Sequence, residues 1–163
     1  MRGLLKMGKT IDTREAYGNA LLKLAEKYKN FVVLDADLSS ATKTGEFVKK
    51  YPSRAFNFGI AEQNMMGFAV GLSTVGLIPF AGTFAVFAAG KTFDQVRQEI
   101  AYPKSNVKIV ATHGGLTVGE DGATHQAIED ISLMRTLPNM TVIVPCDAIE
   151  TEKAIEEMIK FNG

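Results

Sequence analysis

The sequence predicts an α/β fold in which a mostly parallel sheet lies between two layers of helices, a three-layer α/β/α arrangement. Short apolar stretches typical of buried strands alternate along the chain with longer stretches of helical periodicity. The 163 residues suit one domain over 1–163 that is large enough to bury a core. Apolar residues make up 46% of the chain and charged residues 22%, which is the composition of a globular protein.

The expected elements follow one another in regular order. Strands are expected at 31–34, 55–58, 77–81, 107–112 and 141–144, and helices at 13–28, 42–50, 61–74, 84–101, 126–136 and 147–161. The first helix carries an apolar stripe, and Asp12 or Thr13 can cap its start. Pro52 stops the second helix, and Gly59 turns the chain into the third. Pro79 suggests irregular pairing of the third strand.

Several polar side chains follow directly after the expected strands. Right-handed crossovers between parallel strands place every strand-to-helix loop along one edge of the sheet. The loops that carry Asp37, Glu62, Thr83 and 113–125 are therefore expected to converge. Ligands of open α/β sheets bind outside this carboxyl edge.

Both histidines of the chain, His113 and His125, lie in one glycine-rich loop of this kind. Glycines let the backbone approach a ligand closely, and imidazole titrates near neutrality. Asp121 and His125 are four residues apart. His125 could donate to a substrate oxygen while Asp121 accepts from a hydroxyl, which suits a polyhydroxylated substrate. Alternatively, Asp121 or Thr124 caps the next helix.

Glu62, Phe84 and Phe87 each have a functional and a structural interpretation. Glu62 opens a mainly apolar helix, where a partly desolvated carboxylate suits proton exchange but also complements the helix dipole. Phe84 and Phe87 share one helical face, which could stack on a flat heteroaromatic ligand or simply pack in the core.

Composition and motifs argue against several other functions. The net charge is zero, so no basic field attracts nucleic acid or an anionic membrane. Cys146 is the single cysteine, and the longest apolar stretch is too short to span a bilayer, so we expect a soluble, cytoplasmic protein. The histidine spacing does not suit zinc. The letters of GxxxxGK[ST] occur only at 3–10, before the first expected strand, and GxGxxG does not occur, so neither phosphate-binding loop is expected after a strand.

Three motifs occur in the order Gly59-Ile-Ala-Glu62-Gln-Asn, Gly82-Thr-Phe84-x-x-Phe87 and Gly119-Glu-Asp121-Gly-x-Thr-His125-Gln. Together they resemble the pyrimidine-binding domain of the transketolase family, and the resemblance covers about residues 10–161. It implies the thiamine diphosphate-binding fold and an enzyme that uses thiamine diphosphate.

The resemblance also implies a role for each matching cofactor position. Glu62 matches the glutamate that hydrogen-bonds the aminopyrimidine ring nitrogen and promotes proton transfer, which makes it a catalytic residue. Phe84 and Phe87 match the aromatic surface that stacks on the pyrimidine. Asp37 matches an acidic residue near the cofactor.

Four positions match residues that bind the substrate in the family. Asp121 and His125 match contacts to the hydroxyls and carbonyl of the donor sugar, so His125 is the second candidate catalytic residue. His113 and Arg14 match residues that bind the substrate phosphate. Arg14 lies at the start of the first helix, where amides and a guanidinium can share an anion.

One family motif does not occur in this sequence. In the family, a separate domain holds the diphosphate and magnesium through Gly-Asp-Gly and a later asparagine. Glu120-Asp121-Gly122 is not that motif, and no asparagine follows it at the required distance. We therefore expect no metal ligands here, and expect Mg²⁺ to be held by a diphosphate-binding partner chain or domain. The third, C-terminal domain of the family is also expected to be absent from this chain.

The resemblance implies a transketolase of the pentose phosphate pathway that moves a two-carbon ketol unit between sugar phosphates. The chain is expected to be inactive alone and active in a homo- or hetero-oligomer, such as a dimer, that brings in the diphosphate-binding domain. One alternative is a 1-deoxyxylulose-5-phosphate synthase-like enzyme, although His113 and Glu120-Asp121 favour transketolase. Another is a non-catalytic binding or assembly module of the same fold.

Overall fold

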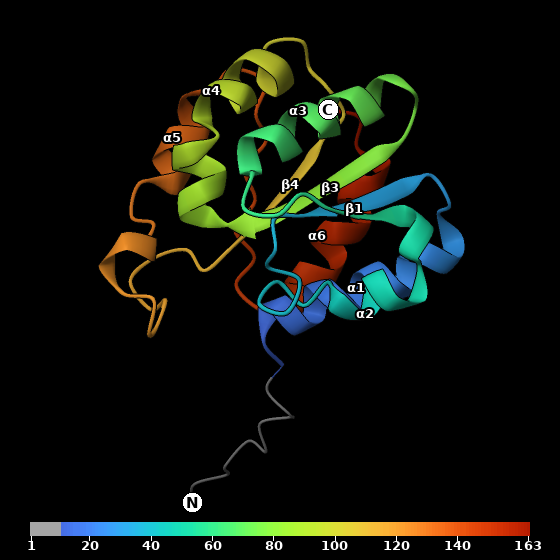
Figure 1. Cartoon of the computed structure of the whole chain (residues 1–163), viewed down its shortest axis with the longest axis horizontal. Helices are drawn as coiled ribbons and strands as arrows, with labels where there is room; N and C mark the ends of the chain where they lie inside the picture. The colour runs from blue at the N-terminus through green and yellow to red at the C-terminus, as the bar shows by residue number, and fades with distance from the viewer. Residues whose placement is uncertain (1–10) are drawn as a thin grey trace, which may run out of the picture.

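The computed structural model describes residues 11–163, so residues 1–10 of the expected domain lie outside the described part (Figure 1). The strands are β1 (Phe31–Asp35), β2 (Ala55–Asn57), β3 (Ile78–Phe84) and β4 (Lys108–Thr112). The helices are α1 (Thr13–Lys27), α2 (Gly45–Lys50), α3 (Glu62–Thr74), α4 (Phe93–Gln95), α5 (Asp130–Thr136) and α6 (Ala148–Lys160). Shorter turns are η1 (Pro52–Arg54) and η4 (Ala123–His125), both 3₁₀, and η2 (Val86–Lys91) and η3 (Val96–Ala101), both π-helical.

The four strands form one parallel sheet in the order β2-β1-β3-β4. Asp35 at the end of β1 lies opposite both Asn57 and Gly82, and Phe84 at the end of β3 lies opposite Thr112. The carboxyl ends of the strands are therefore aligned at one edge of the sheet. This is the edge at which the predicted loops were expected to meet.

Helices cover both faces of the sheet, as the sequence predicts (Figure 1). On one face α1, α2 and α6 pack on a core in which the Phe31 ring lies 5.5 Å from the Phe80 ring, measured between centroids. On the other face α3, α4 and the π-helical turns cover a core that includes Met65 and Val96. The three-layer α/β/α arrangement is confirmed.

Two predictions from the second half of the chain were wrong. Residues 141–144 pair with no other strand among the described residues, and Ile143 and Val144 are exposed. The helix expected from 126 begins only at Asp130, because the Gly115 N–H donates to the Ala127 carbonyl at 2.7 Å and holds that segment extended. Such long-range pairing overrides the local helical pattern.

The third strand and the helix after it also differ from the prediction. β3 continues to Phe84, and the expected helix over 84–101 is interrupted by two π-helical turns. Pro79 keeps a regular register opposite Val32, whereas β4 pairs with β3 only from Phe80 onward. The N–H that proline lacks is therefore not needed on the β4 side. None of the helices described for residues 11–163 is long and apolar enough to cross a lipid bilayer.

Candidate functional site

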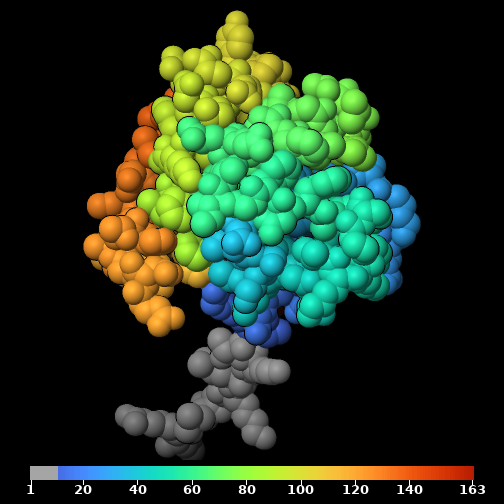
Figure 2. Space-filling model, viewed as in Figure 1, coloured from blue at the N-terminus to red at the C-terminus, as the bar shows by residue number. Residues whose placement is uncertain are grey.

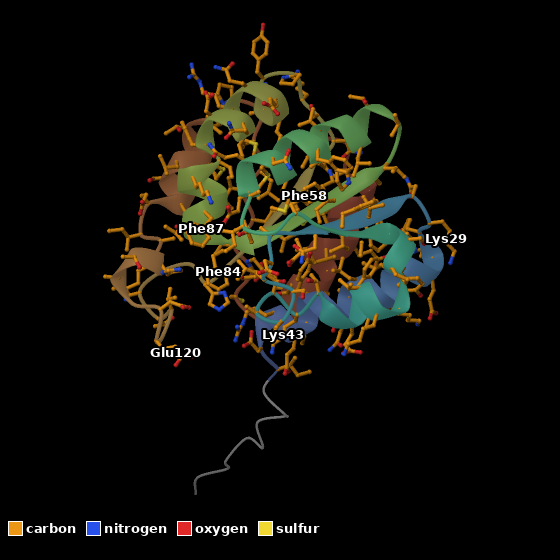
Figure 3. All side chains as sticks on the ribbon, viewed as in Figure 1. Lys29, Lys43, Phe58, Phe84, Phe87 and Glu120 are labelled. Atoms are coloured by element: carbon orange, nitrogen blue, oxygen red, sulfur yellow. The ribbon has the colours of Figure 1, made fainter. Side chains whose placement is uncertain are left out.

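The aromatic residues singled out by the sequence lie at the carboxyl edge of the sheet. Figure 3 shows Phe84 and Phe87 together near the loop that carries Glu120, whereas Lys29, just before β1, lies on the opposite side of the molecule. In Figure 2 the loop coloured orange projects beside the yellow-green helical segment that follows β3. The strand-to-helix loops therefore converge as predicted.

Glu62 is the first residue of α3 and is almost fully buried, with 1% of its surface exposed. Its carboxylate accepts a hydrogen bond from Lys91, the last residue of η2, and the two form an ion pair. The Lys91 ammonium also lies 5.8 Å from the centroid of the Phe87 ring. The buried carboxylate and the aromatic surface are therefore adjacent.

The two phenylalanine rings differ in exposure. Their planes are nearly parallel, at 6°, and their centroids are 6.1 Å apart. Phe84 is buried, and the centroid of the His113 ring lies 4.0 Å from its own. Phe87 is only partly buried. Phe87 therefore has more surface available to a ligand.

His113 follows β4 and is held from two sides. The Arg14 Nη1 lies 3.1 Å from His113 Nε2, and the Thr112 hydroxyl lies 2.8 Å from His113 Nδ1. Partial burial and the positive charge of Arg14 lower the pKa of His113. The Arg14 guanidinium also donates to the Ala41 carbonyl and pairs with Asp12 at 2.7 Å. The two predicted phosphate-binding residues thus lie in direct contact.

His125 lies in η4, with its ring nearly perpendicular to the Phe87 ring, at 81°, and a centroid distance of 5.4 Å. The Thr124 hydroxyl lies 2.9 Å from His125 Nδ1. Asp121 is exposed and makes no side-chain hydrogen bond among residues 11–163. The structure therefore brings His125 to the aromatic surface and leaves the Asp121 carboxylate open to solvent.

Asp37 lies in the loop after β1 and is exposed, with a positive φ of 64°. Its N–H donates to the side-chain oxygen of Asn57 at 3.1 Å, and the Asn57 amide donates back to the Asp37 carboxylate at 3.4 Å. The same loop is anchored by the buried Asp35, which accepts from the Leu38 N–H at 2.7 Å. Burial raises the pKa of Asp35.

Sequence reasoning missed three of these residues: Asp35, Asn57 and Lys91. Asp35 and Asn57 end adjacent parallel strands, a position that the strand prediction itself makes worth inspecting. Lys91 is the first charged residue after Glu62, since residues 63–90 carry no charged side chain. Residues 11–163 hold no cluster of three His, Cys, Asp or Glu side chains that could bind a metal ion.

The family model of the transketolase pyrimidine-binding domain matches residues 9–163. The chain belongs to the transketolase family. A putative transketolase C-terminal section of Methanocaldococcus jannaschii is 54% identical over 150 residues, which are 92% of this chain and 48% of that protein. A 6-deoxy-6-sulfo-D-fructose transketolase subunit of a Clostridium species is 40% identical over 92% of this chain and 47% of its own length.

The fold of this transketolase domain also matches solved structures. A structure described as a split gene transketolase, inactive beta4 tetramer, has a TM-score of 0.84 and 58% identity, over 94% of this chain and 49% of its own. The chain therefore spans about half the length of these relatives.

Proposed function

We propose that this chain is the pyrimidine-binding part of a thiamine diphosphate-dependent transketolase, which transfers a two-carbon ketol unit between sugar phosphates. The proposal is carried by one observation: the buried carboxylate of Glu62 lies beside the partly exposed ring of Phe87, with Lys91 adjacent to both. A carboxylate oxygen can accept a hydrogen bond from a ring N–H, and a ring face can stack on a heteroaromatic ring. These residues fit an aminopyrimidine.

Each residue of the site has a defined task in this proposal. When bound, thiamine diphosphate supplies the electron sink for breaking and forming the carbon–carbon bond beside a ketose carbonyl. Glu62 holds a proton at the pyrimidine ring nitrogen, in a position from which water is excluded. Phe87, backed by Phe84, orients the ring plane. Asp37, in the loop at the same sheet edge, is assigned to the cofactor as well.

The sugar substrate is assigned to the two histidine-bearing segments. The Arg14 guanidinium, next to His113, can bind a phosphate group through its positive charge and through the one N–H that Asp12, Ala41 and His113 leave unengaged. His125, beside the aromatic surface, donates to the carbonyl or a hydroxyl of the donor sugar. Asp121 accepts from sugar hydroxyls, a task that suits an exposed loop carboxylate without other partners among residues 11–163.

The diphosphate and Mg²⁺ are assigned to a partner chain or domain. One feature supports this: the chain spans about half the length of its relatives. The structure described as an inactive beta4 tetramer of a split gene transketolase also supports an assembly that needs a second kind of chain.

Reconstitution tests the proposal. The chain alone is expected to show negligible transferase activity, and a diphosphate-binding chain with thiamine diphosphate and Mg²⁺ is expected to restore it. Glu62→Gln in the restored complex should reduce kcat by about a hundredfold or more, because the amide cannot take part in proton transfer. Full activity of this chain without a partner would refute the proposal that the active site is shared with a second chain or domain. If the restored complex is as active with Glu62→Gln as with wild type, Glu62 has no role in proton transfer, and this chain is better described as a non-catalytic binding or assembly module.

The donor specificity is tested in the same complex. Ketose phosphates are expected to act as donors, and 6-deoxy-6-sulfofructose belongs in the panel because a relative is named for it. Pyruvate is expected to be inactive. Turnover of pyruvate with glyceraldehyde phosphate would instead favour a deoxyxylulose phosphate synthase-like enzyme.

A further inference from the structure

The ion pair between Glu62 and Lys91 joins two different elements at the site. The Lys91 Nζ donates to Oε2 of Glu62, whose side chain is 2% exposed. Within residues 11–163 no other side chain or backbone N–H donates to this carboxylate, so its Oε1 has no donor there. One carboxylate oxygen is therefore engaged, and the other is available.

The pair solves a problem that the burial of Glu62 creates. An ionised carboxylate removed from water is stable only where an opposite charge or hydrogen bonds offset its lost hydration. Lys91 supplies the opposite charge, and because its side chain is 39% exposed the ammonium keeps part of its own hydration. The arrangement thus provides a buried negative charge without enclosing the lysine.

The backbone of η2 determines the position of Lys91. The Thr92 N–H donates to the Phe87 carbonyl at 3.1 Å, five residues back, as in a π-helical turn. Phe87 and Lys91 are four residues apart and so lie on the same side of the turn, with Nζ 5.8 Å from the ring centroid. One ammonium group therefore lies beside both the carboxylate and the aromatic ring assigned to the pyrimidine.

We propose that Lys91 is a positioning residue for Glu62. It supplies the carboxylate with an opposite charge and fixes Oε2, so that Oε1 is presented to the N–H of the aminopyrimidine ring. Lys91 acts through the carboxylate and does not touch the reacting atoms. This inference rests on the proposed function of the site.

A double-mutant cycle on the chain alone tests the coupling without any cofactor. Lys91→Met should lower Tm by about 4–8 °C, because it leaves a buried carboxylate without its counter-charge. In the Glu62→Gln background the same change should lower Tm much less. The exposed pair of Glu46 and Lys49 on α2 is the matched control, for which the two single changes should add to within about 1 °C. Additive effects at Glu62 and Lys91 overturn the proposal.

The complex with the diphosphate-binding chain tests the effect on the cofactor. Lys91→Met is expected to lower kcat about 10- to 100-fold and to weaken thiamine diphosphate binding about tenfold in calorimetry, with the KM for the donor sugar unchanged. Lys91→Arg should recover most of both losses, because it restores the charge. Lys49→Met should leave both quantities as in wild type.

The outcomes separate this inference from the proposed function. A wild-type complex that shows no cofactor-dependent transfer refutes the proposed function and this inference together. An active wild-type complex in which Lys91→Met matches wild type in kcat and in cofactor affinity refutes the role of Lys91 alone.

Discussion

Arg14 and His113 are 99 positions apart in the sequence, yet their side chains meet with 3.1 Å between Nη1 and Nε2. A guanidinium can only donate, so His113 Nε2 is the acceptor and the ring proton lies on Nδ1, next to the Thr112 hydroxyl. Burial and the Arg14 charge both lower the pKa of His113. His113 is therefore neutral at pH 7, and the positive charge of the pair is that of Arg14.

Arg14→Gln is expected to raise the pKa of His113 toward its ordinary value of 6.5, because the change removes the nearby positive charge while burial remains. Stability follows the same linkage. Because the pKa of His113 is lower in the folded chain than in the unfolded chain, the unfolding free energy of the protein decreases as pH falls below 6.5. The unfolding free energy of Arg14→Gln should decrease less over the same pH range. Imidazole NMR titration measures the change. Lys49→Gln, on the exposed face of α2, is the control, and an unchanged His113 pKa in Arg14→Gln would contradict this account.

Phe84 and Phe87 should respond differently to truncation. Phe84 is 5% exposed, so Phe84→Ala is expected to cost the chain about 3–4 kcal/mol of unfolding free energy. Phe87 is only partly buried, so Phe87→Ala should cost less stability but weaken thiamine diphosphate binding by about tenfold or more in the complex. Urea unfolding and calorimetry measure the two effects. The two phenylalanines would not differ in role if Phe84→Ala and Phe87→Ala lost equal stability, or if Phe87→Ala bound thiamine diphosphate as tightly as wild type.

The sequence predicted those features of the fold that local pattern determines. Alternating strands and helices fix a parallel sheet, and the parallel sheet brings the loops at Asp37, Glu62 and His113 to one edge. Apolar flanks predicted that Glu62 is partly desolvated, and the structure shows it almost fully buried. These inferences need no knowledge of distant contacts.

The features that the sequence did not predict depend on long-range pairing or on helix type. Residues 141–144 have the composition of a strand but no pairing partner among residues 11–163. The contact between Gly115 and Ala127 keeps the next segment extended despite its helical pattern. The π-helical turn that ends at Lys91 shifts the hydrogen-bond register by one residue, which apolar spacing does not reveal.

Arg54 should be a major contributor to stability outside the site. Its guanidinium donates to the carbonyls of Ala25, Tyr28 and Phe31 at 3.2, 3.0 and 3.0 Å, and lies 4.5 Å from the centroid of the Phe31 ring. Arg54→Met is expected to cost about 2–4 kcal/mol in urea unfolding, since it leaves carbonyls without a donor. Arg54→Lys should recover only part of the lost unfolding free energy, because a single ammonium cannot reach all three carbonyls. The exposed Arg97→Met is the control, and an equal loss there would refute the assignment.

Lys108 on β4 should make stability depend on alkaline pH. Lys108 is 3% exposed, and its ammonium donates to the carbonyls of Phe161 and Gly163 at 2.7 and 2.6 Å. Burial lowers the pKa of Lys108 from 10.5 to about 8. Between these two pH values the unfolded chain binds a proton that the folded chain does not, so the contribution of Lys108 to stability rises with pH. The unfolding free energy of wild type minus that of Lys108→Met should therefore increase by about 2–3 kcal/mol from about pH 7.5 to about pH 10.5. Ile109→Val, which changes no titratable group, should give a constant difference. A constant difference for Lys108→Met as well would mean that the two carbonyls stabilise the ammonium enough to cancel the effect of burial.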